Sequence, residues 1–179
     1  DEGYTSFLHH GSFKRKSPEE FLKNANTSLC RASENFEKAK WVIITFGTAW
    51  VYRHIEKDII VSNCHKHPAK EFRREFLSIE EIVNLYTPLI AGLPEKRWIF
   101  TVSPIRHIKD GLHENQLSKA TLLLAIDSLC KKFDNCSYFP SYEIVLDEMR
   151  DYSHFAEDSV HPSEETILKV YEKFKKFAL

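Results

Sequence analysis

Apolar residues recur at spacings of three and four in several stretches of the chain, which is the pattern of amphipathic helices. Ser17 is a good N-cap for the first stretch, because a proline and two glutamates follow it. Ser78 and Glu81 form a capping box at the start of another. The pattern predicts helices over about 18–39, 79–92 and 114–132, and from Ser163 to near the end of the chain.

Short apolar runs between these helices predict strands. Trp41–Phe46 ends at Gly47 and has the composition of a buried strand. The run 97–103 is closed by a proline, and a shorter one covers 136–139. A further short run at 58–62 is predicted to pair with 50–53 as a hairpin.

Helices and strands that alternate in this way indicate an α/β fold with a mostly parallel sheet and helices on both faces. Only three long-range strands are visible, whereas sheets usually have ~4–6. The chain also opens with a helix, where a doubly wound domain normally opens with a strand. We therefore expect that one strand, or two, lies upstream of Asp1.

The length of 179 residues fits a single domain over 1–179. Lys and Arg number 25 against 26 Asp and Glu, so the near-neutral charge argues against a nucleic-acid partner. The longest mostly apolar stretch, 41–52, is shorter than the ~20 residues of a membrane span. The four cysteines form no Cys-x-x-Cys pair, and we expect reduced thiols in a cytoplasmic protein.

Candidate chemistry lies where the strands end, because ligands of open α/β sheets bind at the carboxyl ends of the strands. Polar residues follow the apolar runs at 45–48, at 101–104 and after Pro140. For any one of these residues, the competing interpretation is that it is an ordinary polar residue at the junction of a strand and a loop.

The most informative motif is Asp158-Ser-Val-His161. An Asp three residues before a His can accept the proton of Nδ1, which leaves Nε2 as a general base. The same spacing also occurs in Asp110/His113 and Asp151/His154. The position of His161 distinguishes it from the other two, because it stands after the last strand and directly before the final helix.

Other residues of the chain offer rival chemistry. His9-His10 and Cys64-His65-Lys66-His67 carry metal-ligand types but lack a second half with zinc-like spacing, so no metal and no cofactor is expected. Cys64 is a candidate thiol nucleophile, and a half-buried small residue is the competing interpretation. Arg106 and His107 are candidates for holding an anionic group of a substrate, and the capping of a helix is the competing interpretation.

Several of these stretches together resemble the GSCFA family, a bacterial group related to the SGNH/GDSL hydrolases. The resemblance covers most of the chain in the right order. The matching stretches are 10–13, 46–52, 63–66, 101–107, 138–143 and 151–163.

The resemblance implies a flavodoxin-like fold of the SGNH-hydrolase type, with three α/β/α layers, and hydrolysis or transfer of an ester-linked acyl group. Asp158 and His161 take the places of the Asp and His of a Ser-His-Asp triad. The implied substrate is a small-molecule or carbohydrate ester. Gly47, Thr48, Ser103, Arg106 and His107 are then candidates for the oxyanion hole or the substrate site.

Two departures from the family pattern matter. The Gly-Ser-Cys-Phe-Ala block that gives the family its name is absent, and no apolar strand precedes Ser12, so the nucleophile is expected upstream of this chain. In the Gly-x-Asn-Asp motif of SGNH enzymes Gly47 matches, but Ala49 stands where the Asn belongs. Asn63 or backbone N–H groups near Gly47 are the replacement donors that we consider.

Three classes of function therefore remain open. The leading one is a serine esterase or acyltransferase with His161 as base and Asp158 as its orienting partner. The others are a non-catalytic domain that binds a carbohydrate or acyl ligand, and an enzyme that uses Cys64. The absent strand also predicts an open sheet edge beside 41–46, covered by N-terminal residues or a partner chain.

Overall fold

The computed structural model describes residues 3–178, which form two compact units. The first unit contains the chain up to Ala39 together with Trp50–Phe76, and the second contains Lys40–Ala49 and the chain from Leu77 onward. Asp1, Glu2 and Leu179 lie outside the described residues, so the structure does not bear on a strand before Asp1.

The first unit combines helix α1, Pro18–Lys38, with an antiparallel sheet in the order β3-β2-β4. Its strands are β2 (Trp50–His54), β3 (Ile59–Val61) and β4 (Phe72–Phe76). The predicted hairpin of β2 and β3 is confirmed. Strand β4 was not predicted, because three of its five residues are charged and no apolar run marks it.

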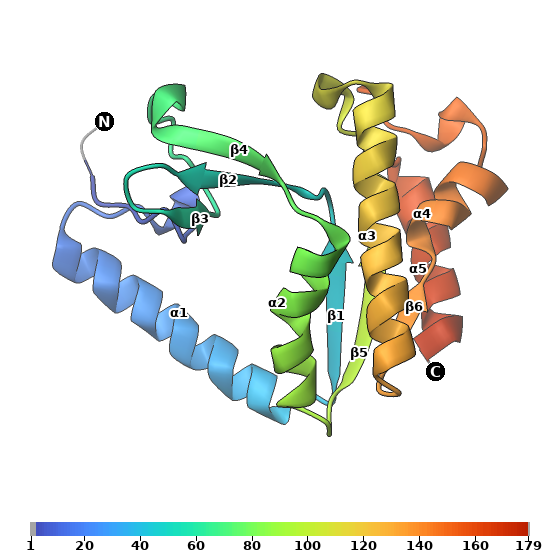
Figure 1. Cartoon of the computed structure of the whole chain (residues 1–179), viewed down its shortest axis with the longest axis horizontal. Helices are drawn as coiled ribbons and strands as arrows, with labels where there is room; N and C mark the ends of the chain where they lie inside the picture. Colours follow the sequence, from blue (N-terminus) through green and yellow to red (C-terminus); the bar gives the residue numbers. More distant parts are fainter. Residues whose placement is uncertain (1–2, 179) are drawn as a thin grey trace. The chain divides into compact units, whose positions relative to one another are not determined.

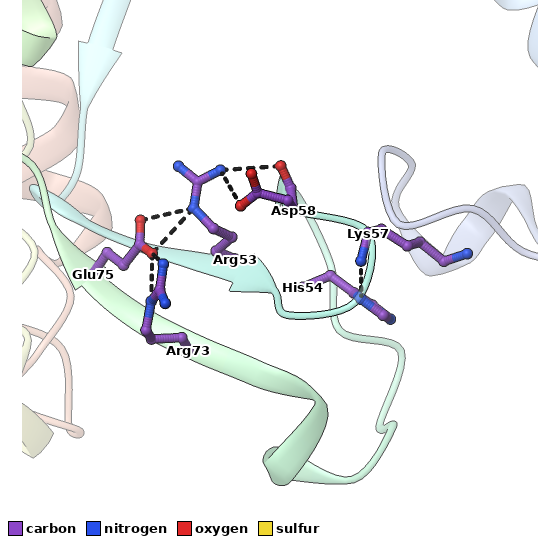
Figure 2. A network of polar contacts seen from close by, with 6 residues as sticks. All are labelled: Arg53, His54, Lys57, Asp58, Arg73 and Glu75. Atoms are coloured by element: carbon purple, nitrogen blue, oxygen red, sulfur yellow. Dashed lines mark hydrogen bonds and ion pairs between the residues drawn. The ribbon is translucent and has the colours of Figure 1, made fainter.

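A charge network on β2 and β4 replaces apolar contacts on one face of this sheet (Figure 2). Arg53 and Arg73 stand directly opposite each other, which would be repulsive alone. The carboxylate of Glu75 accepts hydrogen bonds from both, at 3.0 Å from Arg53 Nε and 2.7 Å from Arg73 Nε. These two bonds, that of Arg73 first, lower the pKa of Glu75. The network is fully paired and holds the two strands together.

The second unit contains the parallel sheet that the sequence predicts. Strands β1 (Trp41–Phe46), β5 (Arg97–Val102) and β6 (Cys136–Phe139) lie in the order β1-β5-β6, with β5 in the middle (Figure 1). The parallel pairing of β1 with β5 is confirmed. The helices of this unit are α2 (Ile79–Ala91), α3 (Leu112–Lys132), α4 (Ser141–Glu143) and α5 (Glu164–Ala178).

Helices pack on both faces of this sheet. On the α2/α3 face, the even-numbered residues of β5 are buried against α2 and α3 in the main core cluster. On the α5 face, Ile99 and Phe139 are buried with Ile144 and Met149, and Val170 and Phe174 of α5 pack against them. Residues of the main cluster include Ile82, Ile90, Trp98, Phe100, Val102, Leu122, Ala125, Ile126 and Leu129.

The predicted burial of Trp41–Phe46 is wrong, although the strand itself is present. Exposure alternates along β1, and Trp41 and Ile43 are 42% and 52% exposed. In the described residues β1 pairs with β5 alone and is an edge strand. Its even-numbered residues pack into the main cluster, whereas its odd-numbered residues lie on the α5 face, where α5 covers β5 and β6.

Candidate active site

A tight loop before α5 carries the Asp-x-x-His motif. Asp158 Oδ1 accepts the backbone N–H groups of Val160 and His161 at 2.9 and 3.0 Å, so the carboxylate organises its own turn. Asp158 Oδ2 lies 2.6 Å from His161 Nδ1. The His161 N–H, the His161 ring and the Val160 N–H, in that order, lower the pKa of Asp158 to about 2. The carboxylate is therefore ionised at neutral pH and fixes the ring.

This hydrogen bond defines how the imidazole is used. An ionised carboxylate only accepts, so Nδ1 carries the proton, and in the neutral ring the lone pair is on Nε2. The two other pairs of the same spacing are arranged differently. His154 Nδ1 lies 3.2 Å from Thr166 Oγ1, and His113 is exposed in the first turn of α3.

The His161 ring lines a cavity of about 420 Å³ on the α5 face of the sheet. The walls are almost entirely apolar, and the imidazole stands among the few polar groups. His161 is 57% exposed, so its Nε2 is accessible to a small molecule. The lining residues are Ile43, Thr45, Thr101, Ser103, Pro104, Ile105, Phe139, Ser141, Val145, His161, Pro162, Ile167, Val170, Tyr171 and Phe174.

No serine hydroxyl bonds to this ring among residues 3–178, where the His161 side chain makes its hydrogen bond to Asp158. Ser103 and Ser141 line the same cavity but are engaged elsewhere. Ser103 Oγ accepts the N–H of Ile105 at 3.2 Å, and Ser141 Oγ donates to the carbonyl of Val102 at 2.7 Å. The structure thus brings together an imidazole and a carboxylate at this cavity.

Arg106 holds the loop of the motif in place. Its backbone N–H donates to the Val160 carbonyl at 3.2 Å, and its Nη1 donates to the Ser159 carbonyl at 3.0 Å. The guanidinium also lies 5.7 Å from the ring centroids of Tyr152 and Phe155. These contacts favour a role in positioning His161 over the predicted contact with an anionic substrate.

The loop after β1 is held from α3 by two polar side chains that the sequence analysis did not single out. Ser118 Oγ accepts the N–H of Ala49 at 2.8 Å and lies 3.0 Å from Thr48 Oγ1. Lys119 Nζ donates to the carbonyls of Gly47 and Ser103 at 2.6 and 2.7 Å. The Ala49 N–H is therefore occupied and is not a donor for an oxyanion.

The sequence does contain a signal that Ser118 and Lys119 are buried polar residues. Both continue the stripe of buried positions that runs through α3 at spacings of three and four, and both are polar. A polar side chain in an apolar stripe must find a partner inside the protein. The pattern indicates burial of Lys119 but not which carbonyls it binds, because these are 72 and 16 residues away in sequence.

His107 lies beside the same loop. Its Nε2 is 3.9 Å from the position that a Cβ on Gly47 would occupy. Its backbone N–H donates to the Oδ1 of Asn115, a buried residue of α3, at 2.9 Å. The second unit thus groups Gly47, Thr48, Ser103 and His107 around the ends of β1 and β5.

The remaining candidates belong to the first unit. Asn63 Oδ1 accepts the N–H of His65 at 2.8 Å, and Ser12 Oγ lies 3.0 Å from His10 Nδ1. Cys64 is half-buried, and burial raises the pKa of its thiol, which reduces the thiolate needed by a nucleophile. Among residues 3–178 no group of three or more His, Cys, Asp or Glu side chains has the arrangement of a metal site.

Comparison with known proteins gives one family. A family model described as the GSCFA family matches residues 1–174. A search of curated proteins gave no match, and a search of solved structures gave none. In the described part of the chain, none of the helices combines the length and the apolar character that crossing a membrane requires.

Proposed function

The chain belongs to the GSCFA family, and we propose that it acts as a serine esterase or acyltransferase of the SGNH type. In this proposal His161 is the general base, Asp158 orients it, and a serine hydroxyl from upstream of these 179 residues is the nucleophile. The single observation that carries it is the 2.6 Å hydrogen bond between Asp158 Oδ2 and His161 Nδ1 beside an apolar cavity. Helices on both faces of the sheet support the three-layer SGNH arrangement.

The proposed reaction follows from the free Nε2 lone pair. His161 Nε2 takes the serine proton while the serine oxygen bonds to the carbonyl carbon of the ester, and an oxyanion forms. The protonated imidazole is stabilised by the Asp158 carboxylate and returns the proton to the departing alcohol. Water, or a second alcohol in a transferase, then attacks the acyl-serine in the same way.

An oxyanion needs hydrogen-bond donors at the position where its charge develops. Gly47 and Thr48 are the proposed residues, because they follow β1 at the carboxyl edge of the sheet. Asn63, the other donor expected from the sequence, belongs to the first unit and is not part of this proposal. Ala49 is not proposed, since Ser118 accepts its N–H.

The walls of the cavity favour an acyl substrate over a carbohydrate. Sugar hydroxyls that leave water need hydrogen-bond partners, and few polar groups line this cavity. An alkyl chain gains free energy from the same surface. A non-catalytic domain that binds an acyl ligand is the second candidate, because the cavity alone would suffice for it.

The first experiment measures hydrolysis of short-chain p-nitrophenyl esters by the longest natural protein that contains these residues. We expect His161→Ala to lower kcat by about 10²–10⁴-fold, the usual contribution of a general base. His113→Ala is the matched control, because it removes a histidine of the same Asp-x-x-His spacing from an exposed position.

Four outcomes are decisive. Equal losses in His161→Ala and His113→Ala, or full activity of His161→Ala, would contradict the assignment of the base. Absence of hydrolysis together with binding of a fatty acid in the cavity would support the non-catalytic candidate. Iodoacetamide inhibition that Cys64→Ser abolishes would favour the thiol enzyme.

A further inference from the structure

Lys119 is a buried cation beneath the loops that end β1 and β5. Its residue is 1% exposed, and its ammonium donates to the carbonyls of Gly47 and Ser103. Burial lowers the pKa of Lys119 to about 8, so the ammonium form prevails at neutral pH. The cation therefore holds two loops that belong to neighbouring strands.

This cation has no carboxylate partner among residues 3–178. Its further contact is the face of Tyr142, 5.8 Å from the ring centroid, and the Tyr142 hydroxyl donates to Gln116 Oε1. An ammonium removed from water without a counter-ion is costly, and an apolar side chain of similar volume avoids that cost. Packing alone therefore does not explain a lysine at this position.

The two carbonyls that Lys119 binds belong to residues of the candidate site. Gly47 opens the loop with the proposed oxyanion donors, and Ser103 lines the cavity beside His161. Three residues after Ser103, Arg106 binds the loop that contains His161. A change in the position of Lys119 Nζ would thus be transmitted to both the oxyanion loop and the support of the base.

We propose that Lys119 is a positioning residue of this site, whose ammonium fixes the spacing between the oxyanion loop and the loop that supports His161. The inference rests on the proposed esterase or acyltransferase function. It assigns Lys119 no contact with substrate. The ammonium also polarises the peptide group between Gly47 and Thr48, which strengthens that peptide as a hydrogen-bond donor.

The test compares Lys119→Met with Lys96→Met. Lys96 is also a buried lysine of this unit, at 3% exposed, but it precedes β5 at the amino end of the strands. We expect Lys119→Met to lower kcat by roughly 10²-fold with little change in KM, because misplacement of about 1 Å has that effect. In a folded sample, Lys96→Met should keep kcat within about 2-fold of the wild-type value. Such a change is much smaller than the loss that misplacement of a catalytic group causes.

The pH profile adds a readout that a purely structural role would not change. Loss of the Lys119 proton above pH 8 should lower kcat in the wild type. This decrease at high pH, the alkaline limb of the plot of kcat against pH, should be absent in Lys119→Met. The Tyr142 hydroxyl and the His107 imidazole also lie near this position, and both are unchanged between the two proteins. The comparison therefore isolates the lysine.

Hydrogen exchange gives a readout that does not depend on activity. In Lys119→Met the amides of Thr48, Ala49 and Ile105 should exchange faster, and in Lys96→Met they should not. If the wild type hydrolyses no ester, the proposed function fails while the exchange result still decides whether Lys119 holds the loops.

A second variant covers the case in which Lys119→Met does not fold. Lys119→Gln keeps N–H donors but carries no charge, and we expect it to fold with a reduced kcat and no alkaline limb. Full kcat with the alkaline limb retained in Lys119→Gln would overturn the proposal. Unchanged kcat and unchanged exchange in a folded Lys119→Met would overturn it as well.

Discussion

The two faces of the parallel sheet differ in how completely they are covered. On the α2/α3 face, Phe100 is fully buried and stacks at 5.9 Å from Phe46 and 6.3 Å from Trp98, measured between ring centroids. On the α5 face, Ile43 of the edge strand is about half exposed and a cavity remains between sheet and helix. One face is a packed core, and the other contains the candidate site.

The difference shows how one sheet can combine a packed core on one face with a candidate site on the other. On the closed α2/α3 side, Ser118 and Lys119 form hydrogen bonds inside the protein with the loop after β1. On the α5 face, His161 remains accessible, so its Nε2 lone pair is available to a reagent. A covered face favours packing, whereas an incompletely covered face leaves room for a substrate.

The largest expected effect is on stability, from removing a ring on the closed face. Phe100→Ala should lower the free energy of unfolding by about 3–5 kcal/mol, because it leaves a cavity among tightly packed rings. Ile43→Ala on the α5 face should change it by less than about 0.5 kcal/mol. Urea unfolding of both variants measures the difference. Comparable losses would show that the two faces are equally packed.

A smaller effect is expected from Ser118→Ala, beneath the loop after β1. The variant leaves the N–H of Ala49 without its acceptor in a buried position, at a cost of about 1–3 kcal/mol. Ser128→Ala in the same helix is the control, since the Ser128 hydroxyl is exposed and bonds only to its own helix at Leu124. If both variants unfold at the same urea concentration, Ser118 does not anchor the loop.

The smallest effect concerns the pH dependence of the exposed Asp158 carboxylate. Its pKa in the folded protein is lowered to about 2, against ~3.9 for an ordinary Asp. A carboxyl group with a lowered pKa stabilises the fold above its unfolded pKa. That contribution should be lost as the pH falls from about 4 through about 2.

The carboxyl carbon shift of Asp158, followed by NMR, measures this directly. Asp158→Asn should remove the corresponding slope from the stability profile while the rest of the profile stays as in the wild type. A midpoint near the ordinary Asp value would mean that the hydrogen bonds to Val160 and His161 do not form in solution.

The helices and the parallel pair of strands could be predicted from the sequence because their signals are local. The caps at Ser17 and Ser78 both accept the N–H three residues ahead, as their residue types predict. The hydrogen bond from His161 to Asp158 spans three residues, so the spacing proposed it together with two other pairs, and the position of His161 and the family resemblance distinguished it. Strand β4 was missed because pairing with β2, and not an apolar run, defines it.

The sequence by itself thus determined the α/β class, the main elements and the Asp158–His161 pair. Only the tertiary structure decided that β1 is an exposed edge strand, that Arg106 braces the His161 loop, and that Lys119 binds two loops. The physical reason is distance along the chain. Caps and periodicity act within a few residues, whereas exposure and the partner of a buried charge depend on segments as far apart as Gly47 and Lys119.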